Sequence, residues 1–140
     1  MFRVSKIMNS GTNQPELFRL PTRENESYLV GTPLIMTAGM LTSPTNSETP
    51  EYIAAESASA NEKSELLCYK VNDDMIFEAT LTSPLSDYTI GKNYPIQPND
   101  YGQGIGVIAA DGDGPALLVG LGNSDDQFKN IGYIRFIKYY

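Results

Sequence analysis

The sequence predicts an all-β protein, a small and mostly antiparallel β-barrel or β-sandwich with long polar loops. Nine prolines spread along the 140 residues leave few windows that are long enough for a helix of average length. Several short segments alternate apolar and polar residues with the period of a half-buried strand, most clearly residues 75–81. The length and an apolar share of 41% fit one domain that spans residues 1–140.

Both ends of the chain carry strand-like apolar patterns. Phe2, Val4 and Ile7 lie in residues 1–26, which form either an N-terminal arm or an edge strand of the same barrel. The last segment, residues 133–140, is apolar or aromatic on both faces, so we expect a strand that packs on both sides or enters a subunit contact. If the ends contact a partner, the candidate side chains are Phe2, Val4, Ile7, Tyr139 and Tyr140.

Two hairpins are predicted in the second half of the chain. Segments 65–71 and 75–81 flank the turn-forming residues Asn72, Asp73 and Asp74. The alternation in 75–81 places four side chains on one face, Met75, Phe77, Ala79 and Leu81. Segments 106–110 and 115–120 flank the glycine-rich turn 111–114.

The remaining segments are predicted to be loops. Residues 54–65 are rich in Ala, Ser and Glu but lack the apolar spacing that would anchor a helix face. Residues 41–50 and 96–106 are polar and rich in residues that favour turns. We therefore interpret all three as solvated surface segments.

A short pattern recurs along the chain. Residues 30–35, 90–96 and 131–134 each place an aliphatic residue and a glycine ahead of a predicted strand. In small barrels such a glycine lets the chain turn sharply into the next strand, although chance recurrence is an alternative in a chain with twelve glycines.

Charge excludes two classes of partner. The formal net charge is −7, with 17 acidic and 10 basic residues, so neither nucleic acid nor an anionic membrane is an expected partner. No stretch approaches the roughly 20 apolar residues of a membrane-spanning helix, and the N-terminus does not resemble a signal peptide. Cys68 is the single cysteine, so it is expected to be a buried thiol.

The composition also argues against an enzyme. Histidine is absent, which removes the Ser-His-Asp and Cys-His designs and the imidazole ligands of metal sites. Turn chemistry explains the acidic segments 111–114 and 123–126, and Pro115 breaks the ligand order of an EF-hand. We predict no catalytic residues, no metal site and no cofactor. A carboxylate pair of the glycosidase type stays open as an alternative.

Four segments resemble a known family. Residues 28–36, 38–42, 50–56 and 69–78 are similar to successive motifs of small structural proteins of tailed bacteriophages, and the resemblance extends over residues 28–136. It implies a virion protein that is made in the host cytoplasm, a head-decoration or head-fibre-base subunit. Its partners would be the major capsid protein or other virion subunits, and it would form a homo-oligomer.

A second interpretation is a receptor- or carbohydrate-binding module of a phage tail. Tyr94 and Tyr101 lie in a polar segment where their rings could stack on sugars. Loss of sugar binding on replacement of both tyrosines would favour this module over a purely architectural role.

Overall fold

The structure is a computed structural model that describes residues 1–7, 15–98, 105–109, 114–122 and 130–137. It confirms the all-β prediction, with mostly antiparallel strands and one 3₁₀ turn, η1 (Leu85–Asp87), in the described ranges. The strands are β1 (Phe2–Ile7), β2 (Leu17–Pro21), β3 (Pro33–Thr37), β4 (Met40–Thr42), β5 (Tyr52–Ala54), β6 (Glu65–Lys70), β7 (Met75–Leu81), β8 (Asn93–Tyr94), β9 (Ile96–Gln97), β10 (Gly106–Val107), β11 (Ala116–Leu121) and β12 (Asn130–Phe136).

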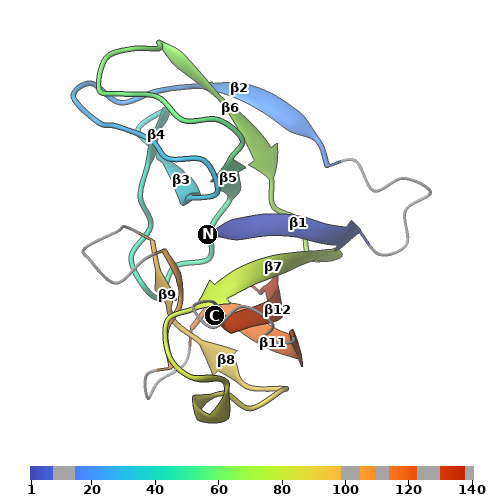
Figure 1. Ribbon diagram of the computed structural model, residues 1–140. Coiled ribbons are helices and arrows are strands. Elements are labelled where there is room, and N and C mark those ends of the chain that lie inside the picture. Colours follow the sequence, from blue (N-terminus) through green and yellow to red (C-terminus); the bar gives the residue numbers. More distant parts are fainter. Residues whose placement is uncertain (8–14, 99–104, 110–113, 123–129, 138–140) are drawn as a thin grey trace.

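The strands form two sheets, one above the other in Figure 1. The lower sheet has the order β8-β11-β12-β7-β10-β9, and β1 adds to it by pairing with β7. Its end strands β8 and β9 are separated in sequence only by Pro95, so the sheet curls back on itself into a nearly closed barrel.

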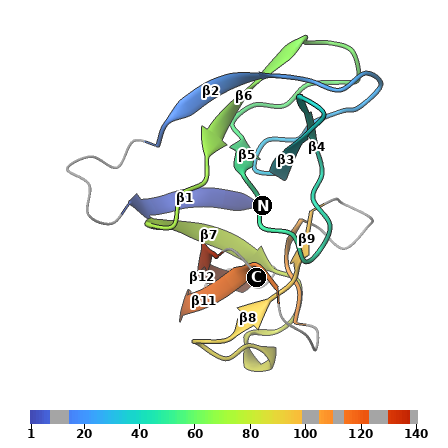
Figure 2. The same ribbon diagram turned by 180° about the vertical axis from the view of Figure 1, so that it is seen from behind.

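The upper sheet has the order β2-β6-β5-β3-β4. An isolated bridge between Thr22 and Leu41 brings the end of β2 back to β4, so this sheet also curls, as the reverse view in Figure 2 shows. The turn between β3 and β4 has positive φ at both Ala38 and Gly39, which is the backbone of a tight type I′ hairpin.

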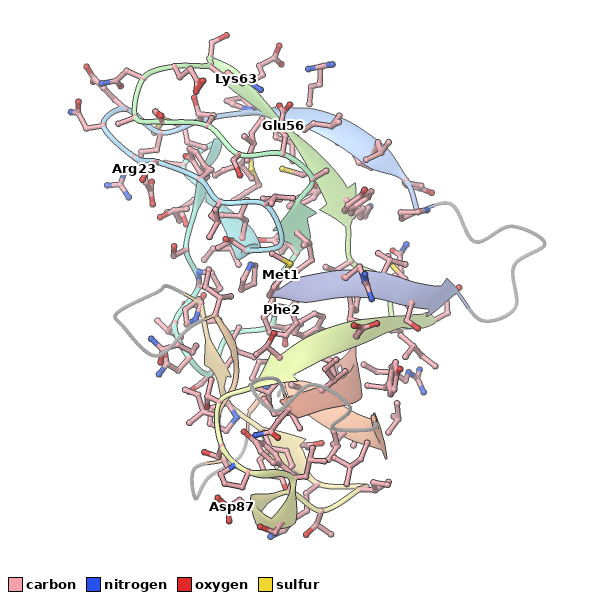
Figure 3. All side chains as sticks on the ribbon, viewed as in Figure 1. Met1, Phe2, Arg23, Glu56, Lys63 and Asp87 are labelled. Carbon is pink, nitrogen blue, oxygen red and sulfur yellow. The ribbon has the colours of Figure 1, made fainter. Side chains whose placement is uncertain are left out.

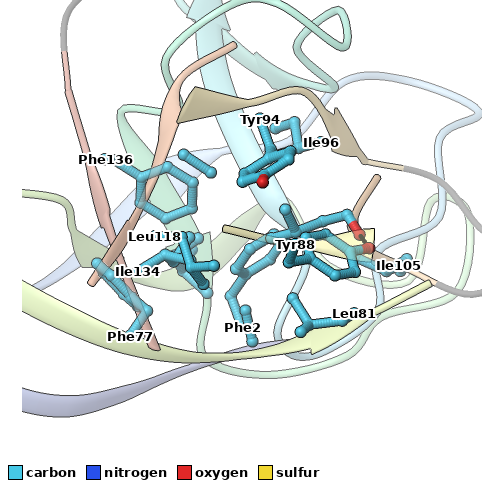
Figure 4. Packing of buried hydrophobic residues seen from close by; sticks show 14 of the residues in the cluster. Phe2, Phe77, Leu81, Tyr88, Tyr94, Ile96, Ile105, Leu118, Ile134 and Phe136 are labelled. Atoms are coloured by element: carbon cyan, nitrogen blue, oxygen red, sulfur yellow. Dashed lines mark hydrogen bonds between the residues drawn. The ribbon is translucent and has the colours of Figure 1, made fainter. Parts of the chain in front are cut away.

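The predicted faces of residues 75–81 are confirmed. Met75, Phe77, Ala79 and Leu81 are buried, and the residues between them are half-buried. Phe77 and Phe136 have ring centroids 5.1 Å apart, and Phe2 lies 5.2 Å from Phe136 on the same core (Figure 4). These tilted aromatic contacts fill the barrel interior with side chains.

A second core cluster lies inside the upper sheet. It contains Tyr28, Leu34, Leu41, Leu66 and Cys68. The upper sheet also contributes Ile53 of β5 to the barrel cluster, so apolar packing passes from one sheet to the other.

The predicted hairpin between 65–71 and 75–81 is wrong. A turn does follow β6, with the Met75 N–H donating to the Asn72 carbonyl at 3.2 Å. It redirects the chain from one sheet to the other, because β6 pairs with β2 and β5 whereas β7 pairs with β1, β12 and β10. The apolar faces of β6 and β7 are buried in different cores, because each strand pairs with segments that are distant in sequence.

The second predicted hairpin, between segments 106–110 and 115–120, is also wrong, because the strands β10 and β11 do not pair with each other. The single pair between β10 and β7 is parallel, Val107 with Leu81, and β10 is antiparallel to β9. β11 instead lies between β12 and β8. Residues 110–113 of the predicted turn lie outside the described residues.

The loop predictions are partly confirmed. Residues 54–65 contain no helix and are mainly exposed, as predicted, although Ala54 and Ala58 are buried. The segment 41–50 is more buried than its composition indicates, because Leu41 belongs to β4 and is fully buried. Its Asn46 carbonyl accepts a hydrogen bond from the Ile96 N–H at 3.0 Å, so this segment joins the upper sheet to the barrel. In 96–106, the described ends are strands, and 99–104 lie outside the described residues.

Two of the three recurring segments form the same turn. Residues 28–32 and 88–92 each place a positive-φ glycine, Gly31 or Gly91, at the same position. In both, the residue after the glycine donates to the carbonyl three positions earlier at 3.2 Å. The third segment differs, since Gly132 lies within β12.

The chain ends belong to the sheets. β1 pairs with β7 and buries Phe2, and β2 pairs with β6, so the described parts of residues 1–26 do not form a separate arm. β12 lies between β11 and β7, with Ile134 and Phe136 buried. The predicted terminal strand is therefore a central strand of the barrel.

Candidate functional site

The predicted partner-binding residues lie in different environments. Phe2 is only 2% exposed and packs in the barrel core, so the prediction that its side chain is a surface contact is corrected. Val4, on the same strand, is half-buried and packs against the edge of that core. The backbone of Ile7 pairs with Met75. Tyr139 and Tyr140 lie outside the described residues.

The predicted ligand loop needs a similar correction. Tyr94 belongs to β8, is 6% exposed and stacks edge-on against Tyr88 with the ring centroids 5.1 Å apart. Its hydroxyl oxygen accepts a hydrogen bond from the Thr89 N–H at 2.6 Å. Pairing of Tyr94 with Ala116 turns the ring into the barrel, so it offers no face to a sugar. Tyr101 lies outside the described residues.

A groove of about 350 Å³ lies where β1 passes the upper sheet. Val4 lines it from β1, Val30 from the repeated turn, Tyr69 from β6, and Pro15 from the segment before β2. Met1 and Phe2 also border it, at the waist between the two sheets (Figure 3). The Phe2 N–H donates to the Gly31 carbonyl at 3.0 Å and fixes this end of β1 against the turn.

Two strands near this groove have an edge that pairs with no other strand in the described ranges. In the ranges that the structure describes, β1 pairs only with β7, and β2 pairs along its length only with β6. All but one of the β2 side chains are exposed, including the large apolar Leu17 at 52% and Phe18 at 38%. The Lys70 ammonium lies 5.9 Å from the centre of the Phe18 ring, which is the range of a cation–π contact.

A second and more polar pocket, of about 590 Å³, opens on the upper sheet. Glu26, Ser57, Ser59 and Glu62 are among its lining residues, and Thr32 lines it from the residue before β3. Two of these residues each have a buried oxygen with no hydrogen-bond partner, Oε2 of Glu26 and Oγ1 of Thr32. Sequence reasoning missed this pocket because its residues show no motif and come together only through the fold.

The buried thiol is an expected feature that the structure confirms. Cys68 is fully buried, and burial raises its pKa to about 12. Burial also raises the pKa of Tyr28, whose ring lies in the same cluster.

At the far end of the upper sheet, an exposed ion pair joins Lys63 to Glu56 at 2.9 Å (Figure 3).

The described residues contain no group of three or more His, Cys, Asp or Glu side chains that could hold a metal ion. Within the same residues, no helix is both long and apolar enough to cross a membrane.

Compared with models of known protein families and with curated protein sequences, the chain gives no match.

Proposed function

We propose that this chain is a structural protein of a tailed bacteriophage, a decoration or head-fibre-base subunit that binds the assembled head and has no catalytic role. Three of the four segments that resemble this class coincide with elements that build the upper sheet. Residues 28–36 contain the repeated turn and β3, residues 38–42 the tight turn and β4, and residues 50–56 contain β5. The glycines of the resemblance therefore have specific backbone roles, Gly31 and Gly39 both at positive φ.

The groove beside β1 is the observation that carries the proposal. A free strand edge next to apolar side chains fits the addition of a strand from a partner, with main-chain hydrogen bonds for affinity and pockets for specificity. Val4 and Val30 supply apolar contacts in the groove, and the exposed Leu17 of β2 pairs with the groove residue Tyr69. The groove volume of about 350 Å³ holds a few side chains, so the partner would insert a short segment.

Oligomer formation and head attachment would both use strand edges and exposed apolar side chains. A shell is built from repeated copies, so a subunit bound to it experiences a high local concentration of its own kind. An edge strand such as β2, with exposed apolar side chains, can pair with a sister subunit while β1 faces the capsid protein. The acidic charge keeps the unbound subunit soluble.

A matched pair of variants tests the proposal. Val30 is 39% exposed and lines the groove, whereas Ile90 is 56% exposed in the copy of the same turn that borders the barrel. Val30→Glu and Ile90→Glu therefore make the same charge change in the same backbone setting. The measurement is co-sedimentation with purified heads of the phage that carries this protein, with light scattering for the solution mass.

We expect wild type and Ile90→Glu to sediment with heads, and Val30→Glu to bind at least about tenfold more weakly. Failure of wild type to bind heads would refute the proposed function. Equal binding of the two variants would refute the groove as the contact surface.

A further inference from the structure

The two sheets are built in the same way. The upper sheet runs β2-β6-β5-β3-β4 with antiparallel neighbours, and a parallel bridge between Thr22 and Leu41 returns from β4 to the end of β2. The lower sheet runs β7-β12-β11-β8 with antiparallel neighbours, continues through β9 to β10, and returns to β7 by a parallel pair between Val107 and Leu81. Each sheet therefore repeats one five-stranded unit, with β8 and β9 together in the place of β3.

Hydrogen bonds show which residues of the two units are equivalent. Tyr28 and Tyr88 begin the same turn, and their hydroxyls donate to Leu41 and Val107, the residues that form the two parallel pairs. The partners of these pairs, at the ends of β2 and β7, are therefore equivalent as well. This equivalence aligns β2 with β7 residue by residue.

Phe18 of β2 and Phe77 of β7 share one position in this alignment. Each lies four residues before the parallel pair, and each pairs with a buried residue of the neighbouring strand, Phe18 with Cys68 and Phe77 with Ile134. Their exposure nevertheless differs, since Phe77 is 0% exposed and Phe18 is 38% exposed. One of the two equivalent strands is therefore covered and the other is open.

β1 is the strand that covers one unit and has no counterpart on the other. It lies alongside residues 75–79 of β7, on the edge opposite β12 (Figure 1). The equivalent residues of β2 are 16–20, and in the described ranges they pair only with β6. The outer edge of β2 thus corresponds to an edge that binds a strand within the same chain.

The backbone of β2 leaves hydrogen-bonding groups at this edge. The Glu16 carbonyl accepts a hydrogen bond from β6 at 3.0 Å, so the backbone groups of Leu17 and Arg19, at the alternate positions, point away from β6. Pro15 and Pro21 on either side have no N–H. Only a short added strand fits between them.

The pairs between β1 and β7 indicate which side chains an added strand needs. Two apolar residues of β1 lie opposite core residues of β7, Phe2 opposite Ala79 and Val4 opposite Phe77. Between them, Arg3 lies opposite Glu78 and forms an ion pair with it.

In β2 the charge at the central position is reversed. Arg19 occupies the position of Glu78, between Phe18 and Leu20. It is exposed and forms no salt bridge within the described part of the chain. The Lys70 ammonium, 5.9 Å from the centre of the Phe18 ring, adds a second positive charge. An added strand therefore needs an acidic residue opposite Arg19 and an apolar residue on either side of it.

We propose that the outer edge of β2 binds an extended segment of a partner protein, antiparallel to β2, with one acidic residue between two apolar residues. Glu16, at the start of the edge, disfavours a second acidic residue opposite it. The inference goes beyond the proposed function, because it follows from the repeated unit and holds for any partner that carries such a segment. A second copy is the competing occupant, but its open-edged strands β1 and β2 carry Arg3 and Arg19, so charge favours a different protein.

NMR titration of the isotope-labelled full chain with two capped peptides tests the proposal. One peptide has the order Thr-Phe-Glu-Val-Thr-Thr, and the other has lysine in place of glutamate. We expect the glutamate peptide to bind with a Kd below about 1 mM and to shift the amide signals of Leu17 and Arg19. The lysine peptide should bind at least about fivefold more weakly. Absence of binding, equal binding of the two peptides, or shifts confined to β1 and residues 29–31 would overturn the proposal.

A charge swap locates the contact. Arg19→Glu should reverse the preference, so that the lysine peptide binds at least about fivefold more tightly than the glutamate peptide. Arg23→Glu makes the same charge change at an exposed residue beyond the end of β2 and should keep the wild-type preference. Reversal in both variants would reduce the effect to net charge and overturn the site.

Leu17→Pro separates strand addition from side-chain contact. An edge strand tolerates proline where the N–H faces away from the sheet, so the melting temperature should stay close to that of wild type. Binding of the glutamate peptide should fall at least about tenfold, and Leu17→Ala, which keeps the N–H, should lose less. Unchanged binding in a folded Leu17→Pro protein would contradict strand addition. A wild-type dimer in light scattering that Leu17→Pro converts to a monomer would assign the edge to a second copy and overturn the proposed partner.

Discussion

Tyr28 and Tyr88 occupy the same position in two copies of one turn, one in each sheet. Each ring is buried, and each hydroxyl donates to a distant backbone carbonyl, Tyr28 to Leu41 at 2.9 Å and Tyr88 to Val107 at 2.6 Å. The glycine three residues later pairs with the neighbouring strand in both copies, Gly31 with Ala54 and Gly91 with Leu118, at 2.8 Å. In both copies, a buried tyrosine therefore anchors the turn to the core just before the chain enters a strand.

The two tyrosines should differ in energetic importance. The Tyr28 hydroxyl also accepts from the Arg23 N–H at 2.8 Å, whereas the Val107 carbonyl that Tyr88 binds is also bonded by the Thr82 N–H at 3.0 Å. Tyr28→Phe should lower the free energy of unfolding by about 1–3 kcal/mol, and Tyr88→Phe by less. Urea denaturation of both variants measures the difference, and an equal or reversed order would contradict this hydrogen-bond assignment.

Close approach of β10 to β7 should make Gly106 irreplaceable. A Cβ atom at Gly106 would lie 2.1 Å from the Thr80 carbonyl oxygen, a backbone atom that cannot move without breaking the strand pair. Gly106→Ala should cost about 1–3 kcal/mol or more. Gly120→Ala is the control, since its nearest neighbour, a side-chain atom of Tyr133, would be 3.6 Å away. Equal melting temperatures for the two variants would show that the β10–β7 contact is looser than described.

The face assignment of β7 predicts a contrast between adjacent residues. Phe77 is fully buried among aromatic rings, so Phe77→Ala should cost about 3–5 kcal/mol. Ile76 points to the other face and is half-buried, so Ile76→Ala should cost clearly less. Denaturant unfolding gives both values. A loss below about 1 kcal/mol for Phe77→Ala would refute the assignment.

Alkaline pH should destabilise the fold through Cys68. Burial raises the thiol pKa from 9.0 to about 12, so the unfolded chain loses this proton first and stability falls as pH rises above 9. The raised pKa of Tyr28 acts in the same direction above pH 10. Unfolding free energies between pH 8 and 11 should fall less steeply for Cys68→Ala than for wild type. Parallel curves would show that the thiol does not titrate as its burial requires.

Reactivity of the same thiol provides an independent check. Because Cys68 is fully buried and protonated at neutral pH, a thiol reagent should modify it only when the upper sheet opens. The labelling rate should rise with denaturant in step with unfolding. Rapid labelling of the native protein would contradict the position of Cys68 in the second core.

Local patterns predicted the strands better than their partners. The alternation in residues 75–81 identified the buried face of β7 because side-chain direction depends only on the strand period. Pairing depends on distant segments, so the adjacent strands β6 and β7 were assigned to one hairpin although they belong to different sheets. The recurring Gly31 and Gly91 turns were visible because a positive φ has a local sequence signal.

Site residues were harder to predict for the same reason. Phe2 and Tyr94 were predicted to be exposed contacts. Pairing of Phe2 with Ala79 and of Tyr94 with Ala116 instead turns both side chains inward. Val4 lines a groove that forms only because β1 passes the upper sheet, so its sequence neighbours could not indicate the groove. The pocket that joins Thr32 to Pro98 has no sequence signal at all, since the two sheets bring these residues together.

Amide hydrogen exchange on the head-bound protein shows which strands contact the head without the need for a variant. If the groove beside β1 meets the virion, binding to heads slows exchange in β1, in β2 and in residues 29–31, and leaves the equivalent turn at 88–92 unchanged. Slowed exchange at 88–92 with none at β1 and β2 would contradict the groove as the surface that meets the virion.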